Sequence, residues 1–260
     1  MLFDSKNIYN ALAEQYDAYR PHYPGEALLF LVTLGDLDGS GDVADIGTGT
    51  GRIARDISKY VRVVYAVDTA AAMLERLQAS ADEEGISNIR IIEAPGEATG
   101  LQSDSLDLIT LAQSFHWMDK PAALQEASRI LKPNKPLVLL WNQITNMQDK
   151  YYSEITSLIK EHNPDYKGGV DIISNDFADH FKDSHHFGPI DRYTFPFEIQ
   201  YTHENYVGFL LSKSYVGMGI PSSHLPNFIE QAHTILRNEF PNNTVIEKYE
   251  TVMLVSRKIN

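Results

Sequence analysis

Short apolar runs of strand length alternate with helix-length segments between residues 42 and 141. The runs are rich in β-branched residues, and the segments between them show helical spacing of apolar residues and end near Gly or Pro. The expected strands are 43–46, 61–67, 89–92, 106–111 and 137–141. Parallel strands joined by helices require right-handed crossovers. The pattern predicts a doubly wound α/β sheet, whose ligands bind at the carboxyl ends of the strands.

The pattern differs on either side of this region. Two helices, 8–20 and 25–34, come before it and are joined by the proline-containing turn 20–24. Helical patterns dominate after the fifth strand, and two further strands, 193–199 and 249–256, are expected to pair antiparallel at the edge of the sheet. We therefore expect an α/β fold with a doubly wound, mostly parallel, seven-stranded sheet, an antiparallel edge strand and a mainly helical cap.

The charge and the composition exclude several classes of function. The 260 residues include 22 Lys and Arg against 35 Asp and Glu, for a net charge of −13, so nucleic acid is disfavoured as a substrate. The chain has no cysteine, which excludes disulfides and thiolate metal sites. No window approaches the roughly 18 apolar residues of a membrane span, and the first residues lack a secretory pattern. We expect a cytoplasmic protein that does not enter membranes.

Three glycines follow the first expected strand at every second position. Gly47, Gly49 and Gly51 permit a sharp turn and a close approach of backbone to ligand, because glycine tolerates positive φ. The third glycine comes one residue earlier than in a dinucleotide fingerprint, where Arg52 stands instead, and no phosphate-binding Lys follows. A nicotinamide-dependent oxidoreductase is therefore disfavoured. A tight turn without a ligand stays open as an alternative.

Two carboxylates flank this turn in the expected fold. Asp68 ends the second strand, where it can accept hydrogen bonds from ribose hydroxyls, or can serve as a helix cap or a solvated strand end. Asp45 precedes the glycines, and its charge would repel a pyrophosphate but would favour a cationic amino-acid group. Together they indicate an adenosine ligand that carries an amino acid in place of phosphates.

The stretch VADIGTGTG at residues 43–51 resembles the first motif of class I S-adenosylmethionine (SAM)-dependent methyltransferases. The chain is most similar to the small-molecule methyltransferase type 11 group. Further segments agree at the family's spacing: AVDTAAAM (66–73), APGEA (94–98), LDLIT (106–110), QSFHW (113–117) and ASRILKP (127–133). The resemblance covers residues 8–142 well and the last third only loosely. It implies a Rossmann-like fold, SAM as cofactor and transfer of a methyl group by in-line displacement.

The resemblance also implies a set of cofactor-binding residues. Tyr16 and Arg20 would fold over the cofactor's carboxylate, and Gln113 and Ser114 would face its methionine moiety. Pro95-Gly96 stands where the family often has Asp-Ala, so the Gly96 N–H and the Glu97 side chain would contact the adenine. The full expected set is Tyr16, Arg20, Asp45, Gly47, Thr48, Gly49, Gly51, Asp68, Thr69, Met73, Gly96, Glu97, Gln113 and Ser114.

His116 and Trp117 follow the fourth strand, at the expected mouth of the site. His116 is a candidate general base, with a hydrogen-bonded structural histidine as the alternative, and Trp117 would wall the substrate pocket or pack. No metal is expected, because His185 and His186 lack a third ligand at motif spacing. A set of aromatic residues could line an acceptor pocket or form the core of the cap: Tyr151, Tyr152, Phe177, Phe181, Phe187, Phe209 and Tyr215.

The resulting hypothesis is a SAM-dependent methyltransferase that acts on a small-molecule acceptor, as a monomer or homodimer. A SAM-binding protein without transferase activity, acting as a sensor or partner subunit, is the alternative. We expect a single methyltransferase domain over residues 1–260. Its parts would be lid helices (1–35), a SAM-binding core (38–143), cap segments that bind the acceptor (144–187 and 200–240) and C-terminal strands of the sheet (188–199 and 245–260).

Overall fold

The computed structural model describes residues 5–167 and 176–259, and the chain forms two compact units. Unit 1 consists of Met1–Pro21, Gln143–Asp171 and Pro196–Glu250. Unit 2 consists of His22–Asn142, Ile172–Phe195 and Thr251–Asn260. Three strands of the sheet, Pro136–Ile144, Asp191–Tyr201 and Val245–Arg257, have residues in both units.

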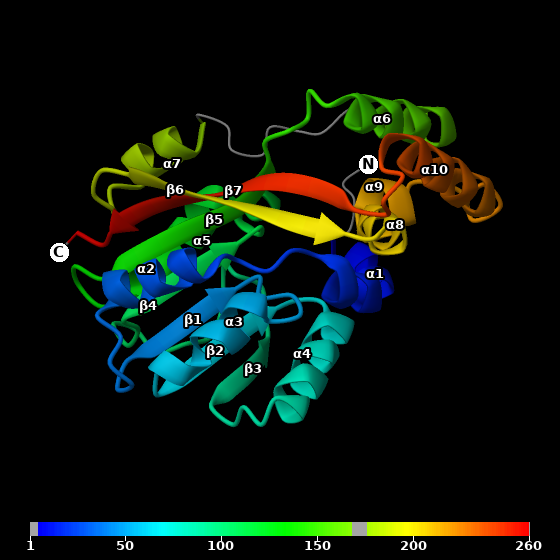
Figure 1. Cartoon of the computed structure of the whole chain (residues 1–260). Helices are drawn as coiled ribbons and strands as arrows, with labels where there is room; N and C mark the ends of the chain where they lie inside the picture. Colours follow the sequence, from blue (N-terminus) through cyan, green and yellow to red (C-terminus); the bar gives the residue numbers. More distant parts are fainter. Residues whose placement is uncertain (1–4, 168–175, 260) are drawn as a thin grey trace. The chain divides into compact units, whose positions relative to one another are not determined.

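A seven-stranded sheet has the order β3-β2-β1-β4-β5-β7-β6. The strands are β1 (Asp42–Ile46), β2 (Val63–Asp68), β3 (Ile89–Glu93), β4 (Leu108–Ala112), β5 (Pro136–Ile144), β6 (Asp191–Tyr201) and β7 (Val245–Arg257). The first five strands are paired in parallel. The last two strands run in opposite directions, as the arrows in Figure 1 show. The predicted α/β class, the mostly parallel sheet and its antiparallel edge are confirmed.

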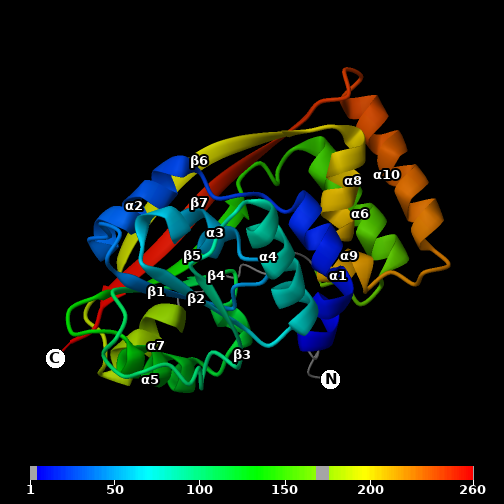
Figure 2. The same ribbon diagram turned by 90° about the horizontal axis from the view of Figure 1, so that it is seen from below.

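Helices cover both faces of the sheet in unit 2. They are α2 (Gly25–Gly35), α3 (Arg52–Ile57), α4 (Ala71–Glu83), α5 (Lys120–Ile130) and α7 (Asp176–Ser184), with short 3-10 helices η1 (Ser58–Tyr60) and η2 (Phe115–Trp117). Side chains of α2, α3 and α4 pack with one set of strand residues, and those of α5 and α7 with another. Figure 2 shows α5 and α7 side by side, away from α2 and α3.

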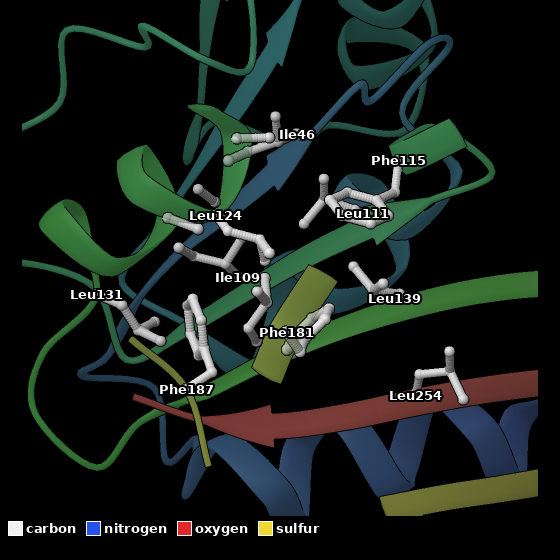
Figure 3. Close-up of a cluster of buried hydrophobic side chains, with 14 of the residues drawn as sticks. Ile46, Ile109, Leu111, Phe115, Leu124, Leu131, Leu139, Phe181, Phe187 and Leu254 are labelled. Carbon is white, nitrogen blue, oxygen red and sulfur yellow. The ribbon is translucent and has the colours of Figure 1, made fainter. Parts of the chain in front are cut away.

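Successive residues of the central strands belong to opposite cores. Val43 and Leu108 pack with α2 and α3, whereas Ala44 and Ile109 pack with α5 and α7. Each strand therefore reads as a continuous apolar run, since both faces of a parallel sheet are covered. Figure 3 shows the second of these cores, where Ile109 and Leu139 meet side chains from α5 and α7.

Unit 1 contains five helices among its described residues: α1 (Ser5–Tyr19), α6 (Lys150–His162), α8 (His203–Leu211), α9 (Ser214–Gly217) and α10 (Leu225–Glu239). Its core is rich in aromatic residues, among them Tyr206, Phe209 and Phe228. Helix α1 packs closely on α8, because a Cβ atom at Gly208 would lie 2.6 Å from the Tyr19 ring. None of the described helices is long and apolar enough to cross a membrane.

The residues between α6 and β6 are divided between the two units. The segment 163–188 shows no clear period, yet its described part includes α7, and α7 belongs to unit 2. Phe177 and Phe181 of this helix are buried against Phe115, with ring centroids 5.3 and 6.3 Å away. The core of the sheet therefore holds this helix, and the assignment of 144–187 to an acceptor cap stays a prediction.

Candidate cofactor site

The glycine turn after β1 has three residues in the left-handed region. The φ angles of Gly47, Gly49 and Gly51 are 69°, 56° and 78°. The N–H groups of Gly47 and Thr48 donate to the Val67 carbonyl over 2.8 and 3.0 Å, which joins the end of β1 to the end of β2. A side chain at any of the three positions would be strained, so the backbone path itself requires glycine.

The three glycines differ in what lies above them. A Cβ atom at Gly47 would lie 2.3 Å from the Ser114 Cβ atom, and one at Gly51 would lie 2.0 Å from Leu77 Cδ1. At Gly49 no heavy atom of the described residues would lie within 4 Å of such a Cβ atom. Gly47 and Gly51 therefore allow close packing within the protein, whereas Gly49 presents open backbone that a ligand can approach.

Asp45 holds this turn from within β1. Its two carboxylate oxygens accept hydrogen bonds of 2.7 Å from the hydroxyls of Thr48 and Thr110. Only 1% of the residue is exposed, and this burial raises the pKa of the carboxyl to about 6. Thr110 is not among the predicted site residues; the sequence signal that could have indicated it is a polar residue within an apolar strand.

Asp68 joins the glycine turn to the start of α4. One oxygen accepts a hydrogen bond of 2.8 Å from the Gly49 N–H, and the other accepts one of 2.9 Å from the Ala70 N–H. Burial raises the pKa of this carboxyl. Ala70 is itself the N-cap of α4, so Asp68 closes the turn before the helix and does not cap its first turn. Contact of Asp68 with a ribose stays a prediction, as do the cofactor contacts of Thr69 and of the buried Met73.

The end of β4 lies beside the end of β1. Ser114 Oγ donates to the Ile46 carbonyl over 2.8 Å, and the Gln113 N–H donates to the Leu140 carbonyl over 2.9 Å. Gln113 has a φ of 58°, which is uncommon for a residue with a side chain and is frequent at functional sites. The structure thus brings Gln113 and Ser114 to the same edge of the sheet as the glycine turn, and their contact with the methionine moiety stays a prediction.

The loop after β3 reaches this edge as well. A Cβ atom at the buried Gly96 would lie 2.7 Å from Ile46 Cγ2 and 2.8 Å from Met118 Cε. Glu97 accepts a hydrogen bond of 2.9 Å from the Asp119 N–H, so its carboxylate connects this loop to the start of α5. The predicted adenine contacts of Gly96 and Glu97 are not tested by these interactions.

His116 lies in η2, directly after Ser114 and Phe115. Its Nδ1 is buried and has no hydrogen-bond partner in the part of the chain that the structure describes. Burial, with the charge of Lys120 as a smaller cause, lowers the pKa of the imidazole to about 4. The neighbouring Trp117 is 43% exposed, and the two ring centroids are 5.1 Å apart. A neutral imidazole with an unpartnered buried nitrogen is compatible with the predicted base, which stays a prediction.

Tyr16 and Arg20 belong to unit 1, whereas the other predicted cofactor residues belong to unit 2. The Arg20 guanidinium carbon lies 5.0 Å from the centroid of the Tyr16 ring, and Nη2 donates to the Ser212 carbonyl over 3.1 Å. The two side chains are therefore neighbours, as their spacing of one helical turn predicts. Their contact with the cofactor's carboxylate stays a prediction.

Most of the aromatic residues considered for an acceptor pocket are core residues. Phe177, Phe181 and Phe187 are buried in the core of unit 2, and Tyr151 and Phe209 in that of unit 1. Tyr152 and Tyr215 are only partly buried. Within residues 5–167 and 176–259, no group of three or more metal-binding side chains is placed to hold an ion.

Comparison with known proteins agrees with this geometry. A family model described as "Methyltransferase domain" matches residues 44–139. An uncharacterised methyltransferase of Schizosaccharomyces pombe is 31% identical over 128 residues, which make up 49% of this chain and 49% of the relative. An uncharacterised methyltransferase-like protein of the same yeast is 28% identical over 183 residues, with 70% of this chain and 68% of the relative covered. The chain thus spans about half the length of the first relative.

Solved structures share the fold at low sequence identity. A proposed type II methyltransferase of Anaeromyxobacter dehalogenans is 18% identical, with a TM-score of 0.65 over 94% of this chain and 98% of that one. The YcgJ protein of Bacillus subtilis is also 18% identical, with a TM-score of 0.57 over 91% of this chain and 100% of that one.

Proposed function

We propose that this chain transfers a methyl group from SAM to a small-molecule acceptor. It carries a class I SAM-dependent methyltransferase domain of the type 11 group, with SAM as its cofactor. A small acceptor is favoured because a net charge of −13 opposes binding of a nucleic-acid backbone. The cap segments 144–187 and 200–240 would bind the acceptor, in a cytoplasmic enzyme that is a monomer or a homodimer.

One observation carries the assignment of the cofactor site: the open backbone at Gly49, placed between two carboxylates. Asp45 lies before the turn and Asp68 holds the Gly49 N–H, while the space above Gly49 is free of described atoms. An anionic pyrophosphate would be repelled by Asp45, whereas the ammonium of SAM suits this carboxylate. Asp68 suits the ribose of either ligand and does not discriminate between them. The residues present therefore fit SAM better than they fit a dinucleotide.

The residues of this chain have three tasks in such a reaction. Bound SAM supplies the methyl group on a sulfonium, which is already a good leaving group. Asp45, Asp68 and the turn 47–51 would bind and orient it, because alignment of the two reactants lowers the entropic part of the barrier. Gln113 and Ser114 would line the part of the site that faces the methionine moiety. His116 would accept a proton from an acceptor that loses one; its imidazole is neutral near pH 7, and its pKa of about 4 makes it a weak base.

Binding and turnover separate this proposal from its alternatives. We expect calorimetry to show binding of SAM and none of NAD, and we expect S-adenosylhomocysteine to form with at least one acceptor from a metabolite library. A mass increase of about 14 Da in the acceptor identifies the product as methylated. Tight SAM binding without turnover of any acceptor would favour a sensor or partner subunit, and binding of NAD alone would refute the cofactor assignment.

The Asp68→Ala variant tests the site itself. Loss of the carboxylate removes the predicted ribose contacts and frees the Gly49 N–H, so we expect SAM affinity to fall at least about 10-fold. The matched control is Asp191→Ala, which removes an exposed carboxylate from the start of β6. Equal SAM affinity in both variants would mean that Asp68 does not contact the cofactor.

A further inference from the structure

Unit 1 contains a buried lysine without a counter-ion. Lys213 lies between α8 and α9 and is only 7% exposed. Among the described residues its ammonium has no ion pair and no side-chain hydrogen bond; it lies 4.4 Å from the centroid of the Phe209 ring and 5.9 Å from that of Tyr215. Lysine is almost never buried without a partner, because desolvation of the ammonium costs several kcal/mol.

A second cation lies against the same aromatic ring. The Arg20 guanidinium carbon is 5.9 Å from the Phe209 centroid, and Nη2 donates one hydrogen bond to the Ser212 carbonyl. Nε of Arg20 is buried and has no hydrogen-bond partner within the described residues. The charge of Arg20 opposes that of Lys213, so the two cations destabilise one another as they stand.

The negative charge nearby does not balance this pair. Glu247 is fully buried, and its Oε1 accepts hydrogen bonds from the hydroxyls of Tyr151 (3.0 Å) and Tyr206 (2.6 Å). It attracts Lys213 electrostatically, but in the described part of the chain it forms no ion pair with Lys213 or Arg20. With Lys213 and Arg20 protonated and Glu247 ionised, the cluster holds two cations and one carboxylate, and burial lowers the pKa of Lys213 and raises that of Glu247.

Three half-buried tyrosines belong to this region: Tyr152 and Tyr215 interact with Lys213, and Tyr166 packs on Tyr215. Tyr152 and Tyr215 both interact electrostatically with charges of the cluster, and Tyr215 stacks on Tyr166 with ring centroids 4.6 Å apart. Their hydroxyls can donate hydrogen bonds, and their rings offer an apolar wall. Since these side chains are partly exposed, the cluster has a border that solvent reaches.

We infer that Lys213 and Arg20 form a carboxylate-binding site that holds an acidic group of the acceptor. The assignment of the carboxylate to an acceptor rests on the proposed function, whereas the binding of a carboxylate by Lys213 and Arg20 does not. A single carboxylate balances the excess charge, and it accepts from both an ammonium and the planar guanidinium. A carboxylate could also come from the cofactor, to which the family resemblance assigns Arg20, so the experiment has to separate the two sources.

The first measurement uses simple probes and the unmodified protein. We expect calorimetry at low salt to show binding of benzoate and succinate, but not of the neutral benzamide and succinamide. In Lys213→Met, which keeps an unbranched side chain on Phe209 without the charge, carboxylate affinity should fall at least 10-fold, and Lys213→Arg should restore part of it. Lys248→Met, at a mostly exposed position of the same unit, should bind as the unmodified protein does.

The inference is overturned if amides bind as well as acids, if Lys213→Met binds carboxylates unchanged, or if inorganic phosphate binds more tightly than either acid. The comparison of acids with amides needs no variant, so it stands even if Lys213→Met does not fold. Failure of the methyltransferase proposal looks different: the protein would bind no SAM, while the response to carboxylates would persist.

A second arm identifies the source of the carboxylate. If it belongs to the acceptor, Lys213→Met leaves the Kd of SAM unchanged and raises the KM of acidic acceptors at least 10-fold. If instead Lys213→Met weakens binding of SAM but not of decarboxylated SAM, the site holds the cofactor's carboxylate, and the acceptor assignment is wrong.

Discussion

At the scale of single residues, Asp45 and Asp68 have structural partners in addition to their proposed ligand. Asp45 holds two threonine hydroxyls, and Asp68 holds two backbone N–H groups. Each carboxylate oxygen has two lone pairs, so these bonds leave capacity for a ligand. Burial nevertheless raises the pKa of both carboxyls, which means that their ionised forms are disfavoured in the free protein. A cation bound nearby would relieve that cost.

The Asp45→Asn variant tests whether the buried carboxylate lowers the stability of the free protein while it contributes to SAM binding. The pKa of Asp45 rises from 3.8 to about 6 on folding, so its contribution to stability is complete below pH 4 and is lost as the pH rises through 6. Asparagine avoids this loss, and we expect the variant to be more stable at pH 8 by about 1–3 kcal/mol, with no such gain at pH 4. SAM affinity should fall at least about 10-fold.

Denaturant unfolding at the two pH values, with calorimetry of SAM at pH 8, measures both effects. Asp191→Asn makes the same charge change at an exposed position and should alter neither quantity. A variant that is less stable at pH 8 would show that Asp45 stabilises the turn as an anion, contrary to this account.

At the scale of elements, the glycine turn combines packing and binding. Gly51 faces Leu77, which is a core residue, whereas Gly49 faces open space. We expect Gly51→Ala to destabilise the protein more than Gly49→Ala, because only the former adds a steric conflict to the strain of positive φ, which costs about 1–2 kcal/mol in either case. Gly49→Ala should remain folded but lose SAM affinity, since its methyl group occupies the ligand's space.

Thermal unfolding and SAM titration of the two variants separate these roles. Gly39→Ala is the matched control: this glycine also has positive φ (95°) and no described atom near its Cβ position, but it lies before β1. Gly49→Ala with the SAM affinity of the control would contradict the assignment of the open backbone to the cofactor.

Local signals explain why some elements were predictable. Helix α5 begins where the sequence indicates, because Asp119 caps it through the Ala122 N–H over 3.0 Å and Pro121 lies in its first turn. The polar segment 163–188, which includes α7, shows little apolar periodicity, so the bounds of this helix were not predicted. Its place is determined by Phe177 and Phe181, which enter a core formed mainly by residues distant in sequence, such as Phe115 and Leu254.

At the scale of the whole molecule, the excess of acidic residues bears on partners. A net charge of −13 should prevent counterion-driven binding to phosphate backbones. We expect no change in fluorescence anisotropy when the protein is added to labelled duplex DNA or to tRNA at about 0.15 M salt. Binding that persists at this salt concentration would reopen nucleic acid as the acceptor, and raising the salt further would show whether the interaction is electrostatic.

Sequence alone was enough to predict the alternating strands, the glycine turn and the two carboxylates beside it, because periodicity and positive φ are local properties. Only the tertiary structure showed that Thr110 holds Asp45, that the space above Gly49 is open, and that α7 joins the core of the sheet. It also brought Arg20 and Lys213 to the same ring from positions 193 residues apart. The sequence shows no pattern that links two charged residues so far apart, because only folding makes them neighbours.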